Sequence, residues 1–208
     1  MTKLRILGRF TSINVRKVLW ACDEMGIAYD REDWGLPLRD PSVPEFLALN
    51  PNAQVPVIVD DGFVLWESNA ILRYLGDRER SDLWPADRQE RARVDQWLTW
   101  QASELGPSWT YAVQNMLRHN PAYGNADEVE KSLGRWTKAM RILEGHLAAA
   151  GGFVANGRFS LADIVLGVSI HRWMMLRFEK PQLPAIESYY AAMQARKAGA
   201  VVLGAATP

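Results

Sequence analysis

The sequence predicts a small α/β domain followed by an all-helical domain. Up to residue 66, short apolar runs alternate with turns and helix-like segments, whereas from residue 89 the apolar residues recur at helical spacing almost throughout. We place the α/β domain at 1–77, a charged linker at 78–88 and the helical domain at 89–208. A chain of 208 residues is long enough for two such units with their own cores.

The first domain is expected to follow the order β-α-β-(α)-β-β-α. Leu4–Leu7 is a short apolar strand. The segment Asn14–Met25 has apolar residues at helical spacing, and Gly26 is placed to end that helix. A second strand is expected over 28–33 and one or two helical turns over 45–49. With the hairpin and helix that follow, this is the order of a thioredoxin-like domain.

The hairpin contains an unusual proline. Asp60-Asp61-Gly62 is a strong turn signal between the apolar runs Val55–Val59 and Phe63–Trp66. Pro56 lies inside the first run, where it removes a donor from the strand ladder. It is either a trans proline that begins an edge strand or a cis proline that turns the Val55 backbone outward. In the second case that backbone could pair with an extended peptide.

Two serines stand where helices begin. Ser68 follows Glu67 and precedes the helical pattern of residues 70–75, and Ser12 lies two residues before Asn14. The residue types alone favour a helix N-cap at both serines. The free N–H groups and positive end of a helix also make the Ser68 position a ready site for a carboxylate.

The helical domain contains its own signals for helix ends. Residues 89–120 form one long amphipathic segment with a possible break at Gly106-Pro107, and Asp127–Ala150 forms another. Ser160 and Asp163 have the spacing of a capping box. We therefore expect Asp163 to be a folding residue and not a catalytic acid.

Composition excludes several classes of function. The 24 basic and 24 acidic side chains balance, so no broad attraction to nucleic acid or to an anionic membrane is expected. The single cysteine, Cys22, cannot form an intrachain disulfide and fits a reducing compartment. No apolar run is long enough to span a bilayer and Met1-Thr2-Lys3 starts no signal peptide, so a cytoplasmic location is expected. The histidines lack metal-ligand spacing, and no metal is expected.

The Val55-Pro56 pair, the Asp-Asp-Gly hairpin and Glu67-Ser68-Asn69-Ala70-Ile71 together resemble the glutathione-binding half of the cytosolic glutathione transferases. The similarity extends over essentially the whole chain. It implies that Pro56 is cis, that the Val55 backbone pairs with the cysteinyl part of glutathione, and that Glu67 and Ser68 receive the γ-glutamyl amine and carboxylate. It also suggests that Gln54 meets the glycyl end, with an exposed loop glutamine as the alternative.

The reaction that such a site supports is attack by the glutathione thiolate. A free thiol has a pKa of about 8.5, and lowering it by about two units needs roughly 2.7 kcal/mol of preferential thiolate stabilisation. One or two hydrogen bonds near a helix N-terminus are of that size. Residues 9–18 resemble the Ser-x-x-x-Arg-x-Val start of serine-type transferases, which implies that Ser12 donates to the sulfur. Thr11 is the adjacent alternative, and Asn14 could contribute its amide or cap the helix.

The absent residue types narrow the subclass. No tyrosine and no cysteine stands beside Thr11 and Ser12, which argues against tyrosine-type transferases and against thiol-exchange enzymes. Cys22 falls on the apolar stripe of its helix and is expected to be a buried packing residue.

The second substrate is expected between the two domains, in a pocket lined by Phe10, Trp109, Val113 and Met116. This composition suggests an apolar electrophile, although a side chain of this kind at helical spacing more often belongs to the core. The family pattern implies a homodimer formed through the helices after Ser68 and Gln89. Peroxide reduction, dehalogenation, isomerisation and a non-catalytic binding or regulatory role remain open alternatives to conjugation.

Overall fold

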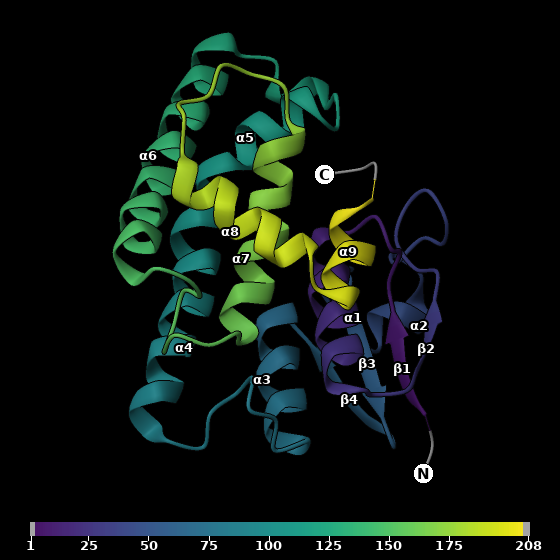
Figure 1. The fold of residues 1–208 in the computed structure, drawn as a ribbon. Coiled ribbons are helices and arrows are strands. Elements are labelled where there is room, and N and C mark those ends of the chain that lie inside the picture. The colour runs from purple at the N-terminus through teal and green to yellow at the C-terminus, as the bar shows by residue number, and fades with distance from the viewer. Residues whose placement is uncertain (1–2, 206–208) are drawn as a thin grey trace.

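The computed structural model describes residues 3–205, so the outermost ends of the two predicted domains, 1–2 and 206–208, lie outside it. Figure 1 shows the sheet on one side and the helical domain on the other, with α1, α3 and α9 between them. The N-terminal domain contains β1 (Leu4–Leu7), α1 (Ile13–Met25), β2 (Tyr29–Glu32), α2 (Pro44–Leu47), β3 (Val57–Asp60), β4 (Phe63–Trp66) and α3 (Ser68–Arg78).

The sheet has the strand order β2-β1-β3-β4. Strand β1 pairs in parallel with β2 and antiparallel with β3, and the Asp60–Phe63 pair closes the antiparallel hairpin of β3 and β4. The parallel pair needs a crossover, and α1 supplies it. The thioredoxin-like order predicted from the sequence is confirmed.

Helix α1 follows its sequence pattern closely. Val15, Val18 and Cys22 are fully buried on the face that packs against the sheet. Gly26 adopts the left-handed conformation, with φ 68°, and donates its N–H to the Cys22 carbonyl, which ends the helix as predicted.

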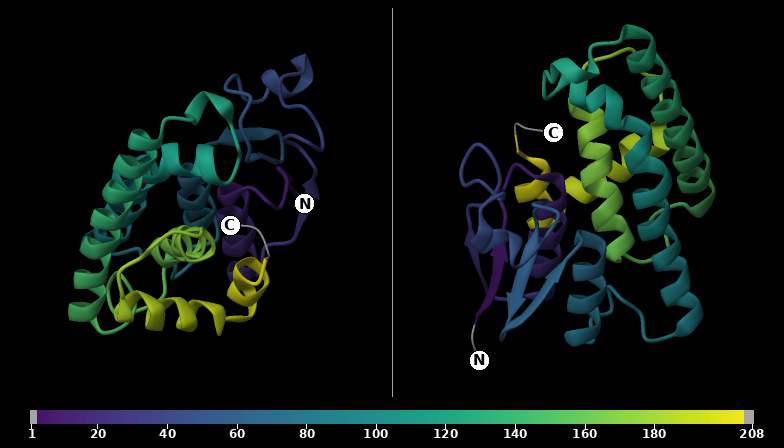
Figure 2. Two further views of the ribbon diagram at one scale, coloured as in Figure 1. Left: turned by 90° about the horizontal axis from the view of Figure 1, so that it is seen from above. Right: turned by 180° about the vertical axis from the view of Figure 1, so that it is seen from behind.

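The helical domain follows in chain order. It contains α4 (Arg88–Trp100), the π-helical segment η1 (Gln101–Leu105), α5 (Gly106–Met116), the 3₁₀ turn η2 (Pro121–Tyr123), α6 (Ala126–Ala150), α7 (Leu161–Met175), α8 (Pro184–Gln194) and α9 (Lys197–Leu203). Seen from above, α7 lies end-on with α4 to α6 on one side and α8 and α9 on the other (Figure 2). Every residue from Leu161 to Trp173 is buried, so α7 is the central helix of this domain.

The break expected at Gly106-Pro107 takes another form. The chain stays helical, and the turn before it widens into η1, where the Gly106 N–H donates to the Gln101 carbonyl five residues back. Pro107 then lies in the first turn of α5, and the widened turn before it accommodates a residue that has no N–H to donate. Such π-helical turns occur frequently at functional sites.

The two domains pack tightly on each other. Trp20 of α1 is fully buried against α7, where a Cβ atom at Gly167 would lie only 2.8 Å from the indole ring. Near the end of α1, the carboxylate of Glu24 accepts two hydrogen bonds from Arg196, at 2.9 and 2.6 Å. These contacts tie α1 to the middle of α7 and to the start of α9.

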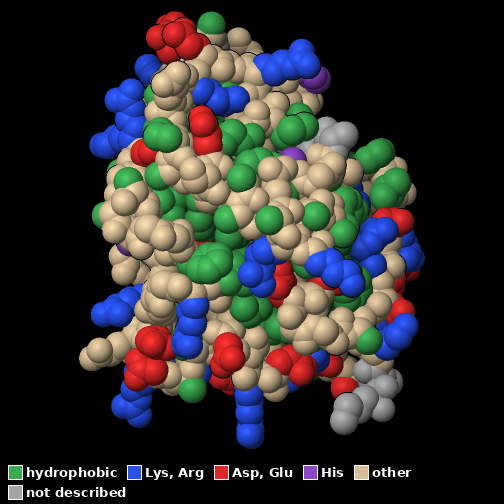
Figure 3. Space-filling model, viewed as in Figure 1, with side chains coloured by type: hydrophobic (Ala, Val, Ile, Leu, Met, Phe, Trp, Pro, Cys, Tyr) green, Lys and Arg blue, Asp and Glu red, His purple; other side chains and the backbone are tan. Residues whose placement is uncertain are grey.

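The outer surface carries charges of both signs. Basic and acidic side chains are interspersed over the face shown in Figure 3. Within residues 3–205, no helix is both long enough and apolar enough to cross a membrane.

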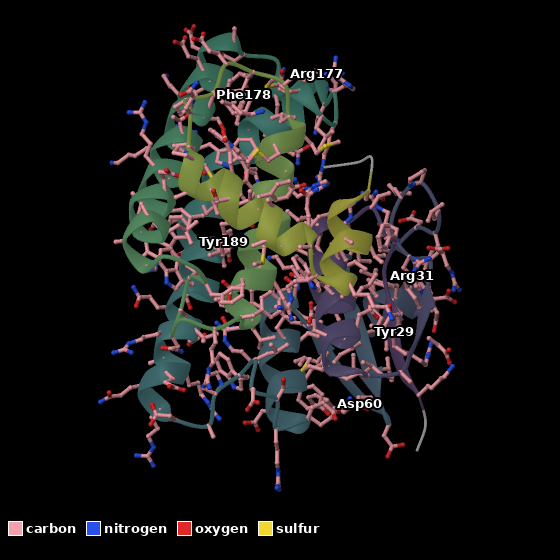
Figure 4. All side chains as sticks on the ribbon, in the orientation of Figure 1. Tyr29, Arg31, Asp60, Arg177, Phe178 and Tyr189 are labelled. Carbon is pink, nitrogen blue, oxygen red and sulfur yellow. The ribbon has the colours of Figure 1, made fainter. Side chains whose placement is uncertain are left out.

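Asp163 anchors the start of α7. Its carboxylate accepts from the N–H and hydroxyl of Ser160, both at 2.8 Å, which confirms the predicted capping box. It also accepts from the Val154 N–H at 2.9 Å and from the hydroxyl of Tyr189, labelled on α8 in Figure 4, at 2.7 Å. Asp163 has no exposed surface, so four donors satisfy a fully buried carboxylate.

We expect Asp163→Asn to lower the free energy of unfolding by about 2–4 kcal/mol, because an amide cannot accept from all four donors. Urea denaturation measures this change. Asp87→Asn is the matched control, since Asp87 caps α4 at an exposed position and asparagine caps equally well. Similar losses in the two variants would contradict the assigned role of Asp163.

Candidate functional site

A cleft of about 440 Å³ lies between the two domains. One wall comes from the starts of α1 and α3, and the other from η1, α5 and α7. The residues that line it are Ile13, Asn14, Lys17, Glu67, Ser68, Asn69, Gln101, Ala102, Gly106, Pro107, Trp109, Thr110, Arg118 and Arg172. The first wall therefore holds Asn14, Glu67 and Ser68, which the sequence analysis selected.

Ser12 is the N-cap residue of α1, but its side chain makes no capping hydrogen bond. Its backbone has the extended conformation, with φ −80° and ψ 124°, and its carbonyl accepts from the Arg16 N–H at 3.0 Å. The half-buried hydroxyl thus stands at the positive end of a 13-residue helix without being used to cap it.

The neighbouring candidates have different surroundings. The Thr11 hydroxyl is exposed and accepts a hydrogen bond from the Arg9 guanidinium. Asn14 is exposed in the first turn of α1 and lines the cleft. Of the three predicted catalytic residues, only Asn14 is part of the cleft lining, while Ser12 lies two residues before it at the same helix end.

The Val55–Pro56 bond is cis, as the family resemblance implied. Val55 is half-buried and Pro56 is buried just before β3 begins. Within the described part of the chain, neither the N–H nor the C=O of Val55 bonds to another backbone group. Gln54 is exposed, and its carbonyl accepts from the Asn50 side chain at 2.8 Å. The edge before β3 therefore offers an unpaired backbone to an extended ligand.

The N-cap that the residue pattern predicted at Ser68 lies one residue earlier. Glu67 is the N-cap of α3, and Ser68 is the first helical residue. Glu67 has φ 73°, which is unusual for a residue other than glycine and costs of order 1–3 kcal/mol. Its exposed side chain does not cap the helix. The first N–H groups of α3 and the buried Ser68 thus face a cleft with an acidic side chain at its edge.

A polar bridge that no sequence pattern predicted lies beneath the cleft. The ammonium group of Lys17, on α1, donates to Gln101 Oε1 at 2.8 Å and to Asn69 Oδ1 at 3.4 Å. Asn69 in turn donates to the Leu98 carbonyl at 2.9 Å. Burial and, as a smaller effect, the charge of Arg172 lower the pKa of Lys17 to about 7, against an opposing effect of Glu67. The bridge joins α1, α3 and η1 at the base of the cleft.

The helical wall carries further positive charge. Arg172 on α7 is only 6 % exposed, and its guanidinium lies over the Trp109 ring at 5.8 Å from the centroid. Burial, followed by the charges of Arg118 and Arg16, lowers the pKa of Arg172 to about 9. In the sequence, the basic residues of this wall could be recognised only as charged side chains within segments that were expected to form packed helices.

The four predicted pocket residues are not brought together. Trp109 lines the cleft and packs on Trp136 with ring centroids 5.2 Å apart. Val113 and Met116 pack within the helical core, and Phe10 packs against the core of the smaller domain beneath Arg16. The cleft lining is consequently more polar than the sequence analysis expected.

Cys22 is fully buried, and burial raises the pKa of its thiol to about 12. A thiol in this state does not act as a nucleophile near neutral pH. The prediction of a packing residue is confirmed. Among residues 3–205, no three His, Cys, Asp or Glu side chains gather in a way that could hold a metal ion.

Comparison with known proteins places this architecture in a family. The model of the glutathione S-transferase N-terminal domain matches residues 11–78, and that of the C-terminal domain matches 126–192. The chain belongs to the glutathione S-transferase family.

Particular relatives extend the match. Glutathione S-transferase GstB of Escherichia coli K12 is 27% identical over 198 residues, covering 94% of this chain and 95% of the relative. Glutathione S-transferase 3 of Zea mays is 33% identical over 169 residues, covering 78% and 75%. The theta class glutathione S-transferase of Xanthomonas axonopodis pv. citri, solved with glutathione bound, is 34% identical over all of both chains with a TM-score of 0.89. The expectations of this fold and of an enzyme of this family are confirmed, whereas the serine-type assignment stays a prediction.

The buried Lys17 leads to a pH prediction. Its pKa of about 7 in the folded protein returns to about 10.5 on unfolding. Between these values the unfolded chain binds more protons, so the free energy of unfolding rises with pH. The free-energy cost of burying the charged Lys17 side chain applies in full below pH 7 and disappears above about pH 10.5. We take the free energy of unfolding of the wild type minus that of Lys17→Met. We expect this difference to rise by up to about 1.4 kcal/mol per pH unit above pH 7.

Urea denaturation across this pH range measures the difference. The control is Lys138→Met, which removes an exposed lysine from α6 and should leave a profile parallel to that of the wild type. A parallel profile for Lys17→Met as well would contradict the burial argument.

Proposed function

We propose that this protein is a glutathione transferase in which the Ser12 hydroxyl stabilises the glutathione thiolate for attack on an electrophile with a hydrophobic body. One observation carries the proposal: Ser12 stands at the N-terminus of α1 with a hydroxyl that makes no capping bond. A serine that served only as a cap would use that oxygen on the helix N–H groups.

Residues of the cleft and of the edge before β3 would together hold glutathione. Val55, held before a cis proline with its backbone unpaired, would bind the cysteinyl unit as a short antiparallel strand. Ser68 and the first N–H groups of α3 would receive the γ-glutamyl carboxylate, and Glu67 its amine. Gln54 would contact the glycyl end. The relative from Xanthomonas axonopodis, solved with glutathione bound, supports glutathione as co-substrate.

The reaction then follows ordinary thiolate chemistry. The thiol proton leaves to solvent, and the Ser12 hydroxyl and the positive end of α1 stabilise the anion. The sulfur lone pair forms a C–S bond with the electrophilic carbon, and the leaving group departs with the electron pair of the bond that breaks. Trp109 lines the opposite wall, and the small part of its ring that stays exposed would contact the hydrophobic body of the electrophile.

A location in the cytoplasm and a role in detoxification complete the proposal. The single cysteine is buried and free, which suits a reducing compartment. Cell fractionation tests the location.

We expect Ser12→Ala to lower kcat/KM with chlorodinitrobenzene by about 100-fold or more. The substitution removes a hydrogen-bond donor to the glutathione sulfur, both in the bound thiolate and as the thiolate forms. The KM for glutathione should change by less than about threefold. Ultraviolet thiolate absorbance of the bound tripeptide should show its thiol pKa rising by about one to two units.

Ser42→Ala, on the exposed loop before α2, is the matched control and should leave the kinetics unchanged. Full activity in Ser12→Ala would move the role to Thr11 or Asn14. Failure of the wild type both to bind immobilised glutathione and to turn over would favour a non-catalytic binding module.

We also propose that the protein is a homodimer through α3 and α4. Two aromatic residues of the edge strand β4 beside α3 support this assignment, since Phe63 is 49% and Trp66 37% exposed. A pair of exposed aromatics next to a helix pair is typical of an interface. Arg73 of α3 bonds Asp95 of α4 at 2.6 Å, which holds the two helices in one surface.

Sedimentation velocity should give twice the monomer mass for the wild type and the monomer mass for Trp66→Glu, because a buried charge would oppose association. Ile142→Glu, on the outer face of α6, should remain dimeric. A monomeric wild type would contradict the dimer.

A further inference from the structure

The charged side chains that line the cleft are mostly positive. Lys17, Arg118 and Arg172 line it, and Glu67 is the one acidic side chain among the described residues that do so. Neither Lys17, Arg118 nor Arg172 forms an ion pair within residues 3–205. The protein therefore gathers like charges in a partly enclosed space, which is unfavourable unless something of opposite charge binds there.

Lys17 and Arg172 differ in how they are satisfied. Lys17 is held by Gln101 and Asn69, so its place is explained by the bridge beneath the cleft. Arg172 is equally buried, but its Nε atom has no hydrogen-bond partner in the described chain. A buried guanidinium nitrogen without an acceptor costs the full desolvation of that group. Arg172 is thus the residue whose burial the folded chain does not explain.

The surroundings of Arg172 place it on the electrophile side. It projects from α7 in the helical wall, and its guanidinium lies over Trp109, the aromatic residue that lines the same wall. The γ-glutamyl carboxylate already has Ser68 and the start of α3 on the opposite wall. Arg118 is exposed at the rim and adds positive charge toward which an anion would be drawn.

We propose that the second substrate is an electrophile that carries a carboxylate, with its hydrophobic body on Trp109 and its carboxylate on the guanidinium of Arg172. This inference rests on the proposed glutathione transferase function. Because Nε is enclosed, the carboxylate would meet the terminal nitrogens of the guanidinium, which can donate two parallel hydrogen bonds to it. The cleft volume of about 440 Å³ must also hold part of glutathione, so the electrophile is small.

Calorimetric titration tests the inference with conjugates in place of the unidentified substrate. We expect the wild type to bind S-(4-carboxybenzyl)glutathione about tenfold or more tightly than S-benzylglutathione. Arg172→Met should lose that preference while binding glutathione with a Kd within about threefold of the wild type. Arg172→Lys, which keeps the charge but not the fork, should retain part of the preference.

Arg177→Met is the matched control. It removes an exposed arginine that Figure 4 labels beyond the end of α7, and it should keep the full preference. In turnover, 4-chloro-3,5-dinitrobenzoate should exceed its methyl ester in kcat/KM, after each is divided by its uncatalysed rate, in the wild type but not in Arg172→Met.

The outcomes separate this inference from the proposed function. If the wild type does not bind glutathione, the transferase proposal fails and the inference fails with it. If glutathione binds but the two conjugates bind equally, the carboxylate inference alone is overturned. If Arg172→Met weakens glutathione itself, Arg172 serves the tripeptide and the inference is again overturned. The comparison of conjugates in the wild type needs no variant, so it decides the question even if Arg172→Met does not fold.

Discussion

The architecture depends on one helix that belongs to two cores. The sheet-facing side of α1 packs through Val15, Val18 and Cys22 against the strands, while Trp20 and Ala21 join the core of the helical domain. Because both sides are buried, α1 fixes the position of one domain relative to the other. The residues on both walls of the cleft are therefore positioned relative to the start of this helix, where Ser12 lies.

The same constraint accounts for the polar groups in the cleft. A helix buried on both sides has no solvent-facing stripe over much of its length, so Lys17 must find its acceptors inside the protein. Asn69 and Gln101 supply them, and through them the bridge aligns α3 and η1 with α1. Arg172 approaches from α7 and leaves a guanidinium that the fold does not neutralise. The packing that holds the two domains together thus also concentrates positive charge where glutathione and the second substrate would meet.

Local patterns in the sequence were reliable where a residue's own conformation or near neighbours decide the outcome. Gly26 ends α1, Ser160 and Asp163 form the capping box, and Cys22 is buried on the apolar stripe. Other expectations shifted because they depended on distant contacts. The break at Gly106-Pro107 became a π-helical turn, and the last part of the predicted helical domain forms two short helices, α8 and α9. Those helices dock onto α6, α7 and α1, which no local pattern in the segment reveals.

The sequence by itself determined the α/β-then-helical order, the Val55-Pro56 and Glu67-Ser68 positions and a serine at the first helix start, because each follows from residues close together in the chain. Only the tertiary structure decided which side chains share the cleft. It placed Trp109 there but left Val113 and Met116 in the core, and it brought Lys17 and Arg172 together from helices far apart in the chain. The physical reason is that burial and charge at a site between domains are set by how the helices pack, and helical spacing does not encode which face meets which partner.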